Sequence, residues 1–262
     1  MVAILLVSEY LNESHDLNQG RPVKTLLGKA LRLLASPIRY SVRYELRRRP
    51  PSHFIPDIGR ELQRRATEST ATYVQQRMAG VDSVSSDQDL ITMAMGRVDQ
   101  ANDLLVCEFG VFSGRTINHI ASLTQSKVYG FDSFEGLPER WRDGFSKGHF
   151  KVEALPKVRP NVSLIKGLFD QTLPQFVADH HKAVGFLHID CDLYSSTKTI
   201  FSALAPLIRP GCIIVFDEYF NYPGWEDGEH KAFMEFMANS GLGFEYIGYN
   251  RLHEQVAVKI TD

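Results

Sequence analysis

From residue 103 onward, short apolar runs alternate with segments of helical spacing. The runs are LLVCEFGV (104–111), KVYGFDSF (127–134), NVSLIKG (161–167), VGFLHIDCD (184–192) and GCIIVFDEY (211–219). Helices are predicted near 114–123, 171–181, 195–207 and 228–239. Continuous apolar strands separated by helices are typical of a parallel sheet that is covered on both faces. The pattern therefore predicts an α/β fold.

The end of the chain has a different pattern. Two apolar runs, FEYIGYN (244–250) and QVAVKIT (255–261), are separated by four residues. This spacing leaves no room for a crossover helix, so the two runs should pair as an antiparallel hairpin at the end of the sheet. One long irregular stretch, 135–160, interrupts the alternation, and a loop of that length in a compact domain is usually functional.

The first 102 residues carry no such alternation, and we predict a helical N-terminal extension or lid (1–102) before a second domain (103–262). Helices are expected over 58–79 and 86–101, with Ser86 as a cap. Residues 1–80 contain 13 Lys and Arg against 7 Asp and Glu, whereas residues 81–262 contain 16 against 24. The basic helical segment 22–49 is interpreted as a solvated face; the alternative is a weak contact with an anionic membrane surface.

Composition and cysteine usage favour a cytoplasmic globular protein. Hydrophobic residues make up 44% of the chain and charged residues 23%, which is ordinary. Cys107, Cys191 and Cys212 lie in apolar runs without a CxxC pair, as expected for buried thiols in a reducing compartment. The apolar run 2–7 is too short to span a bilayer and lacks the flanking signals of a leader. We expect no nucleic-acid partner, and a homo-oligomer is compatible with the sequence.

Acids and glycines gather where the predicted parallel strands end. In open parallel sheets, ligands bind outside the carboxyl ends of the strands. In chain order these ends carry Glu108, Gly110, Ser113 and Gly114; Asp132, Ser133 and Glu135; Gly167 and Asp170; Asp190 and Asp192; and Asp217 and Glu218. The clustering predicts a binding site at this edge of the sheet.

The first two strand ends indicate a nucleoside-containing cofactor. Gly110 and Gly114 allow the backbone to approach a ligand at a helix N-terminus. Asp132 follows about twenty residues later and can accept both hydroxyls of a ribose. The spacing is GxxxG rather than GxGxxG, which disfavours a nicotinamide oxidoreductase. The alternative is that the two glycines only permit tight packing of strand and helix.

The last two strand ends predict a divalent metal site. If their strands are neighbours, Asp190, Asp217 and Glu218 offer three oxygen donors, which suit Mg²⁺. Asp192 is a candidate general base that takes a proton from a substrate hydroxyl. The alternative for Asp192 is that it caps the helix that begins near Tyr194.

Two histidines lie close to these acids in the sequence. His188 is inside the predicted strand and is interpreted as a packed core residue. His230 begins a later helix, from which it could reach the mouth of the site. Neither is counted among the expected metal ligands.

Five segments in register carry a resemblance to a known family: CEFGVFSGRTINHIA, VYGFDSFEGLPERW, LIKGLFDQTLPQF, LHIDCDLYSSTKTIFSALAPLIRPGCIIVFDEY and HKAFMEF. From about residue 103 to 262 the chain resembles the macrocin O-methyltransferase family. These are class I, S-adenosylmethionine-dependent and Mg²⁺-dependent enzymes that methylate sugar hydroxyls on natural products. The resemblance implies a Rossmann-like, seven-stranded, mostly parallel sheet with an antiparallel C-terminal hairpin. It also implies that the acceptor is a small molecule or a glycoside, and a glycolipid is a further candidate for the acceptor.

The resemblance assigns roles to individual residues. The methionine side of the cofactor pocket is matched by Glu108, Gly110 and Gly114. The ribose acid is matched by Asp132, and the region of the adenine by Asp170. Two serines, Ser113 and Ser133, are also expected to contact the cofactor. Asp190 and Asp217 match metal ligands, and Asp192 matches the base. This chain departs from the family at Glu218, where a second aspartate is common; glutamate is one methylene longer and can still ligate.

Two other functions stay open. The DCD motif at 190–192 also opens phosphatases of the haloacid dehalogenase type, but those need Thr or Val where this chain has Tyr194. A catalytically idle module that only binds a cofactor is the other alternative. Idle buried acids are costly, which argues against it.

Overall fold

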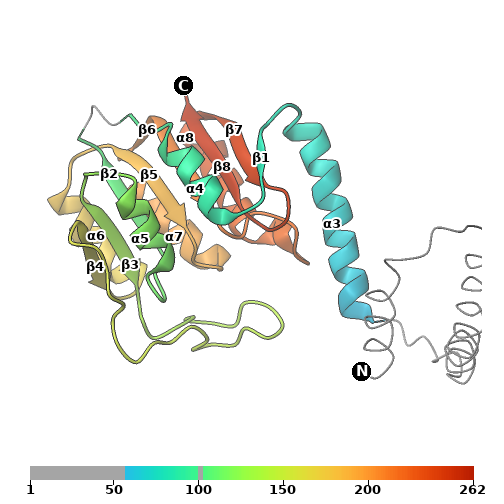
Figure 1. Ribbon diagram of the computed structural model, residues 1–262, viewed down its shortest axis with the longest axis horizontal. Coiled ribbons are helices and arrows are strands. Elements are labelled where there is room, and N and C mark those ends of the chain that lie inside the picture. Colours follow the sequence, from blue (N-terminus) through green and yellow to red (C-terminus); the bar gives the residue numbers. More distant parts are fainter. Residues whose placement is uncertain (1–56, 100–102) are drawn as a thin grey trace, which may run out of the picture. The chain divides into compact units, whose positions relative to one another are not determined.

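The computed structural model describes residues 57–99 and 103–262 (Figure 1). Residues 58–262 form one compact unit. The expected basic helix over 22–49 and the apolar run 2–7 lie outside the described residues. Among the described helices, none combines the length and the apolar character that crossing a membrane requires. The three cysteines are buried and free, as predicted.

An eight-stranded mixed sheet forms the centre of this unit, with the strand order β1-β7-β8-β6-β5-β2-β3-β4. The strands are β1 (Ser83–Val84), β2 (Leu105–Phe109), β3 (Val128–Asp132), β4 (Val162–Lys166), β5 (Val184–Ile189), β6 (Ile208–Phe216), β7 (Gly243–Asn250) and β8 (Val256–Thr261). Neighbours are parallel except that β8 runs antiparallel to both β6 and β7. The predicted Rossmann-like α/β fold and its hairpin are confirmed, and the short β1 adds one strand to the expected seven.

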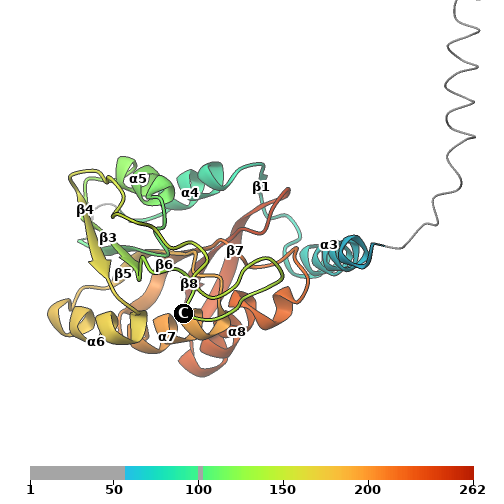
Figure 2. The ribbon, with the colours of Figure 1, turned by 90° about the horizontal axis from the view of Figure 1, so that it is seen from below.

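Helices cover both faces of the sheet, as Figure 2 shows. On one face lie α4 (Asp87–Met95) and α5 (Arg115–Ser122), and on the other lie α6 (Phe169–Asp179), α7 (Tyr194–Leu204) and α8 (Glu229–Ser240). Every residue of β2 and β5 is buried. Their sequences are continuous apolar runs because both faces of these strands pack against helices.

Each face of the sheet has its own hydrophobic core. Leu187 of β5 belongs to one buried cluster together with Phe201 of α7. The preceding residue, Phe186, belongs to a second cluster together with Ile117 of α5. Successive side chains of a strand point to opposite faces, so a single apolar run contributes to both layers.

Helix α4 begins where the sequence predicts but ends earlier. Ser86 Oγ accepts a hydrogen bond from the backbone N–H of Asp89 at 3.1 Å, which is the expected cap. The helix ends at Met95 and does not continue to residue 101. Gly96 follows directly, and glycine is unfavourable in a helix interior.

Residues 58–99 belong to the same unit as the sheet. Strand β1 pairs in parallel with β7. Helix α3 (Ile58–Arg77) contacts the region after β6: the Trp225 indole N–H donates to Ser69 Oγ at 3.0 Å, and the Asn221 N–H donates to Thr70 Oγ1 at 2.9 Å. The expected boundary between residues 102 and 103 therefore does not coincide with an edge of this unit. A role of residues 1–102 in covering the substrate stays a prediction.

Candidate active site

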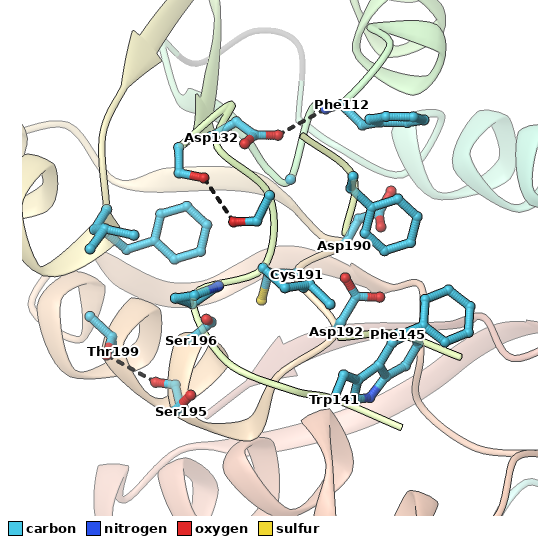
Figure 3. A pocket seen from close by; sticks show the side chains of 18 of the residues that line it. Phe112, Asp132, Trp141, Phe145, Asp190, Cys191, Asp192, Ser195, Ser196 and Thr199 are labelled. Atoms are coloured by element: carbon cyan, nitrogen blue, oxygen red, sulfur yellow. Dashed lines mark hydrogen bonds between the residues drawn. The ribbon is translucent and has the colours of Figure 1, made fainter. Parts of the chain in front are cut away.

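A cavity of about 500 Å³ opens at the carboxyl ends of β2, β3, β4, β5 and β6. This is where an open α/β sheet is expected to bind its ligands. Residues of the long loop between β3 and β4 form part of its wall. In Figure 3, Asp190 and Asp192 lie between Asp132 on one side and the rings of Trp141 and Phe145 on the other.

The turn after β2 lies directly against the end of β5. Gly110 has φ +94°, and a Cβ at this position would lie 1.6 Å from the carbonyl oxygen of Asp190. The Asp190 N–H donates to the carbonyl oxygen of Phe109 at 2.8 Å. Gly110 is thus required by close approach of two strand ends, and it brings the glycine turn next to the acidic motif at 190–192.

Asp132 organises the turns around the cavity. Its Oδ2 accepts hydrogen bonds from the backbone N–H groups of Val111 and Phe112, both at 2.8 Å, and its Oδ1 accepts one from Phe134 N–H at 2.6 Å (Figure 3 shows the bond to Phe112). An ionised carboxylate has about four acceptor positions. Three are used inside the protein, so Asp132 retains part of its acceptor capacity for a ligand in the cavity that it lines.

Four of the residues expected to hold the cofactor line the cavity, namely Gly110, Asp132, Ser133 and Asp170. They come from three successive strand ends that converge because β2, β3 and β4 are neighbours. The glycine turn, the acid after β3 and the segment after β4 therefore form one continuous surface, as the sequence predicts.

The other three expected cofactor residues are not in the lining. Glu108 is fully buried within β2, where it contacts His188. Ser113 is exposed on the turn before α5. Gly114 has φ +80°, and a Cβ there would meet Pro156 at 3.0 Å. The structure thus supports the packing interpretation for both glycines, and Gly110 also lines the cavity.

The expected metal-binding acids and the expected base line the cavity together: Asp190, Asp192, Asp217 and Glu218. Burial, followed by the negative charges of neighbouring acids, raises the pKa of Asp190 and of Glu218 well above the ordinary values. Carboxylates so close together are costly to ionise without a compensating cation. This donor set fits a divalent cation.

Asp192 is not the helix cap that the sequence left as an alternative. The residue before α7 is Leu193, and no side chain caps that helix. Asp192 has φ +64° and is 7% exposed. Burial, together with the charge of Asp217, raises the pKa of Asp192 to about 7. A carboxyl group with such a pKa exchanges protons near neutral pH, which suits a general base.

His188 lies closer to the acids of the cavity than we expected of a histidine that only packs in the core. His188, Asp190 and Asp217 each offer a ligand atom, and these atoms lie within 4.8 Å of one another. Glu218 is not part of this group. His188 Nε2 lies 3.9 Å from Asp217 Oδ1, and His188 Nδ1 lies 2.9 Å from Glu108 Oε1. The sequence reasoning missed this contribution because the pattern around His188 is that of a buried strand.

Glu229 is a second functional candidate that the sequence reasoning missed. It is fully buried at the start of α8. Its Oε2 accepts from the Glu218 N–H at 3.2 Å, and its Oε1 accepts from the Cys191 N–H at 3.5 Å. One carboxyl group thus joins the ends of β5 and β6. Helical spacing contained the signal, since Glu229 shares a face with the apolar Phe233, four residues on.

The loop between β3 and β4 supplies an aromatic wall to the cavity, and its predicted functional role stays a prediction. Trp141, Phe145 and Phe150 all line the cavity. The Arg142 guanidinium lies 3.9 Å from the centre of the Trp141 ring and 3.2 Å from each carboxylate oxygen of Glu254. Glu254 lies between β7 and β8, so the loop is fastened to the hairpin.

The structure does not bring His230 to the cavity. Its Nε2 lies 3.2 Å from the hydroxyl oxygen of Tyr73 on α3. Its ring contacts those of Tyr73, Tyr219 and Trp225 edge to face. His230 therefore belongs to an aromatic cluster between α3 and the sheet.

Comparison with known proteins agrees with this geometry. Residues 107–219 match a family model described as a methyltransferase domain. The described unit has a methyltransferase fold. The matched segment begins within β2 and ends just after Glu218, so it includes every strand end that lines the cavity.

Two curated relatives are O-methyltransferases. One, the 8-demethyl-8-(2,3-dimethoxy-alpha-L-rhamnosyl)-tetracenomycin-C 4'-O-methyltransferase of Streptomyces olivaceus, is 30% identical over 115 residues, which are 37% of this chain and 43% of the relative. The other, the demethyldecarbamoylnovobiocin O-methyltransferase of Streptomyces niveus, is 27% identical over 169 residues, which are 55% of this chain and 62% of the relative. The matches span less than two thirds of either relative.

Two solved structures show the same fold. The calicheamicin methyltransferase CalS11 superposes with a TM-score of 0.53 at 23% identity and covers 65% of this chain and 78% of its own. The O-methyltransferase NovP superposes with a TM-score of 0.50 at 21% identity and covers 67% of this chain and 78% of its own. At these identities, the similarity concerns the fold.

Proposed function

We propose that this protein is an S-adenosylmethionine-dependent O-methyltransferase that acts, with a divalent cation, on a hydroxyl group of a sugar or glycosylated natural product. The observation that carries the proposal is a single cavity that joins the Gly110 and Asp132 turns to the buried acids around Asp192. A methyl transfer to oxygen needs both halves: a place for a nucleoside cofactor and a group that accepts the hydroxyl proton.

On the cofactor side, Asp132 and the glycine turn would hold the nucleoside. Gly110 lines the cavity, and Asp132 keeps acceptor capacity for a ribose hydroxyl. Asp170 and Ser133 line the same part. When bound, S-adenosylmethionine would supply the methyl group, and the cation would polarise the acceptor hydroxyl.

On the acceptor side, Asp192 would take the hydroxyl proton onto its carboxylate. Burial raises the pKa of Asp192, and the positive charge of a cation held beside it would lower that pKa and keep the carboxylate ionised, so that it can act as a base. Asp190 and Asp217 would hold the cation beside it. Because these groups are fixed on the ends of adjacent strands, they are positioned before the reaction. Such positioning can lower the activation free energy by on the order of 7 kcal/mol.

The proposed acceptor class rests on the relatives and on the cavity wall. The curated relatives are named as O-methyltransferases of a rhamnosyl-tetracenomycin C and of demethyldecarbamoylnovobiocin. In this chain, Trp141 and Phe145 lie close to Asp192 (Figure 3), and Phe150 lines the same cavity. Aromatic side chains combine large apolar area with few rotatable bonds, so they suit a glycoside with an apolar aglycone.

Calorimetric titration with S-adenosylhomocysteine tests the cofactor half. We expect wild-type protein to bind in the micromolar range and Asp132→Asn to bind at least about tenfold more weakly, equivalent to about 1.4 kcal/mol. The matched control is Asp227→Asn, an acid whose side chain is 83% exposed; it should bind like wild type. Absence of binding by the wild-type protein would overturn the proposal and return the phosphatase alternative to consideration.

Methyl transfer to a panel of glycosides tests the acceptor half. Asp192→Asn should retain S-adenosylhomocysteine binding while kcat falls by a factor on the order of 10²–10⁴, the usual contribution of a general base. Cofactor binding without turnover on any hydroxyl acceptor would favour the idle binding module instead.

A further inference from the structure

Glu108 and His188 form a fully buried pair beneath the acids of the cavity. Both side chains have 0% exposure, and the two residues are directly paired in the register of β2 and β5. Glu108 Oε1 lies 2.9 Å from His188 Nδ1. When Glu108 is ionised, its carboxylate can only accept a hydrogen bond, so Nδ1 carries the proton and donates it. In the neutral ring, the lone pair is then on Nε2.

His188 Nε2 faces the acids without a hydrogen-bond partner among the described residues. It lies 3.9 Å from Asp217 Oδ1, and it forms with Asp190 and Asp217 a group of ligand atoms within 4.8 Å of one another. Buried polar atoms are nearly always satisfied, so one that is not requires an explanation. A bound cation would supply it, because His188, Asp190 and Asp217 each offer a ligand atom and these atoms lie within 4.8 Å of one another.

The pairing of Glu108 with His188 is the arrangement found around histidine ligands of metals. Such a histidine donates its other ring N–H to a carboxylate or carbonyl, which fixes the ring and increases its basicity. Bonds from a metal to imidazole nitrogen or carboxylate oxygen are about 2.0–2.2 Å long. Atoms 3.9 Å apart, such as His188 Nε2 and Asp217 Oδ1, can therefore contact the same ion.

We propose that His188 is a nitrogen ligand of the cation in this site, with Glu108 as the residue that orients its ring, and that the site prefers a transition-metal dication such as Mn²⁺ over Mg²⁺. The inference rests on the proposed function for the presence of a cation, and it replaces Glu218 by His188 in the expected ligand set. Mg²⁺ prefers oxygen ligands and keeps several waters, whereas imidazole suits the transition metals.

Glu218 has a different environment in this arrangement. Its side chain lines the cavity, and its Oε2 is, like His188 Nε2, buried without a hydrogen-bond partner among the described residues. Its carboxylate is nevertheless not in the group formed by His188, Asp190 and Asp217. Its backbone N–H is fixed by Glu229 at 3.2 Å. Glu218 thus serves as a control residue for the test, since it is acidic, buried and near the cation without being one of its three ligands.

Pulsed electron paramagnetic resonance on Mn²⁺ bound to tag-free, full-length protein gives a direct readout. A nitrogen ligand modulates the electron spin echo, and the frequencies change when histidine is labelled with ¹⁵N. We expect histidine modulation in the wild type and in Glu218→Gln, and its loss in His188→Gln, which offers an oxygen but no imidazole nitrogen. The matched control is His230→Gln, which should keep the modulation. Bound Mn²⁺ without histidine modulation, or modulation that persists in His188→Gln, would overturn the proposal.

Calorimetric titration of the same proteins with Mn²⁺ and with Mg²⁺ measures the preference. The wild type should bind Mn²⁺ at least about tenfold more tightly than Mg²⁺. In His188→Gln, the dissociation constants of the two ions should lie closer together. Glu108→Gln, in which an amide oxygen still accepts from Nδ1, should weaken Mn²⁺ binding about 10- to 100-fold while it keeps the modulation. If His188→Gln fails to fold, this variant and the labelled wild type decide the question.

Neither the resonance measurement nor the metal titration requires cofactor, acceptor or turnover. If Mn²⁺ fails to bind or binds without nitrogen while S-adenosylhomocysteine binding and methyl transfer persist, only the ligand assignment is wrong. If Mn²⁺ binds through His188 but S-adenosylhomocysteine does not bind, the metal site stands and the proposed function is wrong.

Discussion

Gly110 and the carbonyl group of Asp190 are in contact at the bottom of the cavity, so closely that a Cβ on Gly110 would lie 1.6 Å from that oxygen. This contact holds the turn after β2 against the end of β5. It also explains why the glycine turn and the acidic motif share one cavity.

Replacing Gly110 should therefore affect both stability and binding. Gly110→Ala must relieve a backbone overlap and adopt φ +94°, so we expect the free energy of unfolding to fall by about 3 kcal/mol or more. Gly144→Ala is the matched control, because Gly144 has φ +88° but nothing within 4 Å of the added Cβ; it should lose only about 1 kcal/mol. Urea unfolding measures both, and equal losses would show that close approach is not the reason for Gly110.

Glu229 should stabilise the two strand ends as a hydrogen-bond acceptor. Burial raises the pKa of Glu229 well above its ordinary value, which favours the neutral acid, so Glu229→Gln should be nearly as stable as wild type. Glu229→Ala leaves the N–H groups of Cys191 and Glu218 unpaired and should lower the free energy of unfolding by about 1–3 kcal/mol. Glu226→Ala, at an exposed position, should have little effect. A Glu229→Ala protein as stable as Glu229→Gln would contradict this role.

The Arg142–Glu254 ion pair should order the loop between β3 and β4. The two side chains are 29% and 23% exposed, and Arg142 also stacks on Trp141. Glu254→Gln should increase hydrogen exchange in residues 138–150 and raise the KM for the acceptor with a smaller change in kcat. Arg140→Ala, which removes a highly exposed ion pair with Asp143, is the control. Equal hydrogen exchange in both variants would show that the Arg142–Glu254 ion pair does not order the loop.

The burial of His230 should make stability dependent on pH. Burial lowers the pKa of His230, so the unfolded chain, with a pKa of about 6.5, takes up a proton before the native state does. Stability from this residue is complete above about pH 6.5 and decreases as the pH falls from there toward the lower native pKa. Unfolding of wild type and His230→Phe between pH 8 and pH 5 measures the difference.

In that experiment, the stability advantage of wild type over His230→Phe should shrink as the pH falls. His181→Gln, at an exposed position, should parallel the wild type throughout. If the curves of wild type and His230→Phe are parallel as well, protonation of His230 is not opposed by its aromatic surroundings.

The sequence predicted the strands well because these strands are buried on both faces. A continuous apolar run such as the one before Asp190 is typical of a strand that is buried on both faces. The four-residue connection before Gln255 is too short for a crossover helix and allows only a hairpin. The acids at the strand ends were predictable for the same reason, since a carboxylate that follows a buried strand lies at the carboxyl edge of the sheet.

The sequence by itself thus determined the α/β fold, the hairpin and the edge of the sheet at which Asp132, Asp190 and Asp217 gather. Only the tertiary structure decided where His188 lies relative to these acids. Strand order places β5 between β2 and β6, and this brings Glu108 and Asp217 to either nitrogen of one imidazole ring. No local pattern specifies that order, because burial makes every residue of β2 and β5 look like core. The function of a buried polar side chain depends on its neighbours across the sheet, and these come from distant parts of the chain.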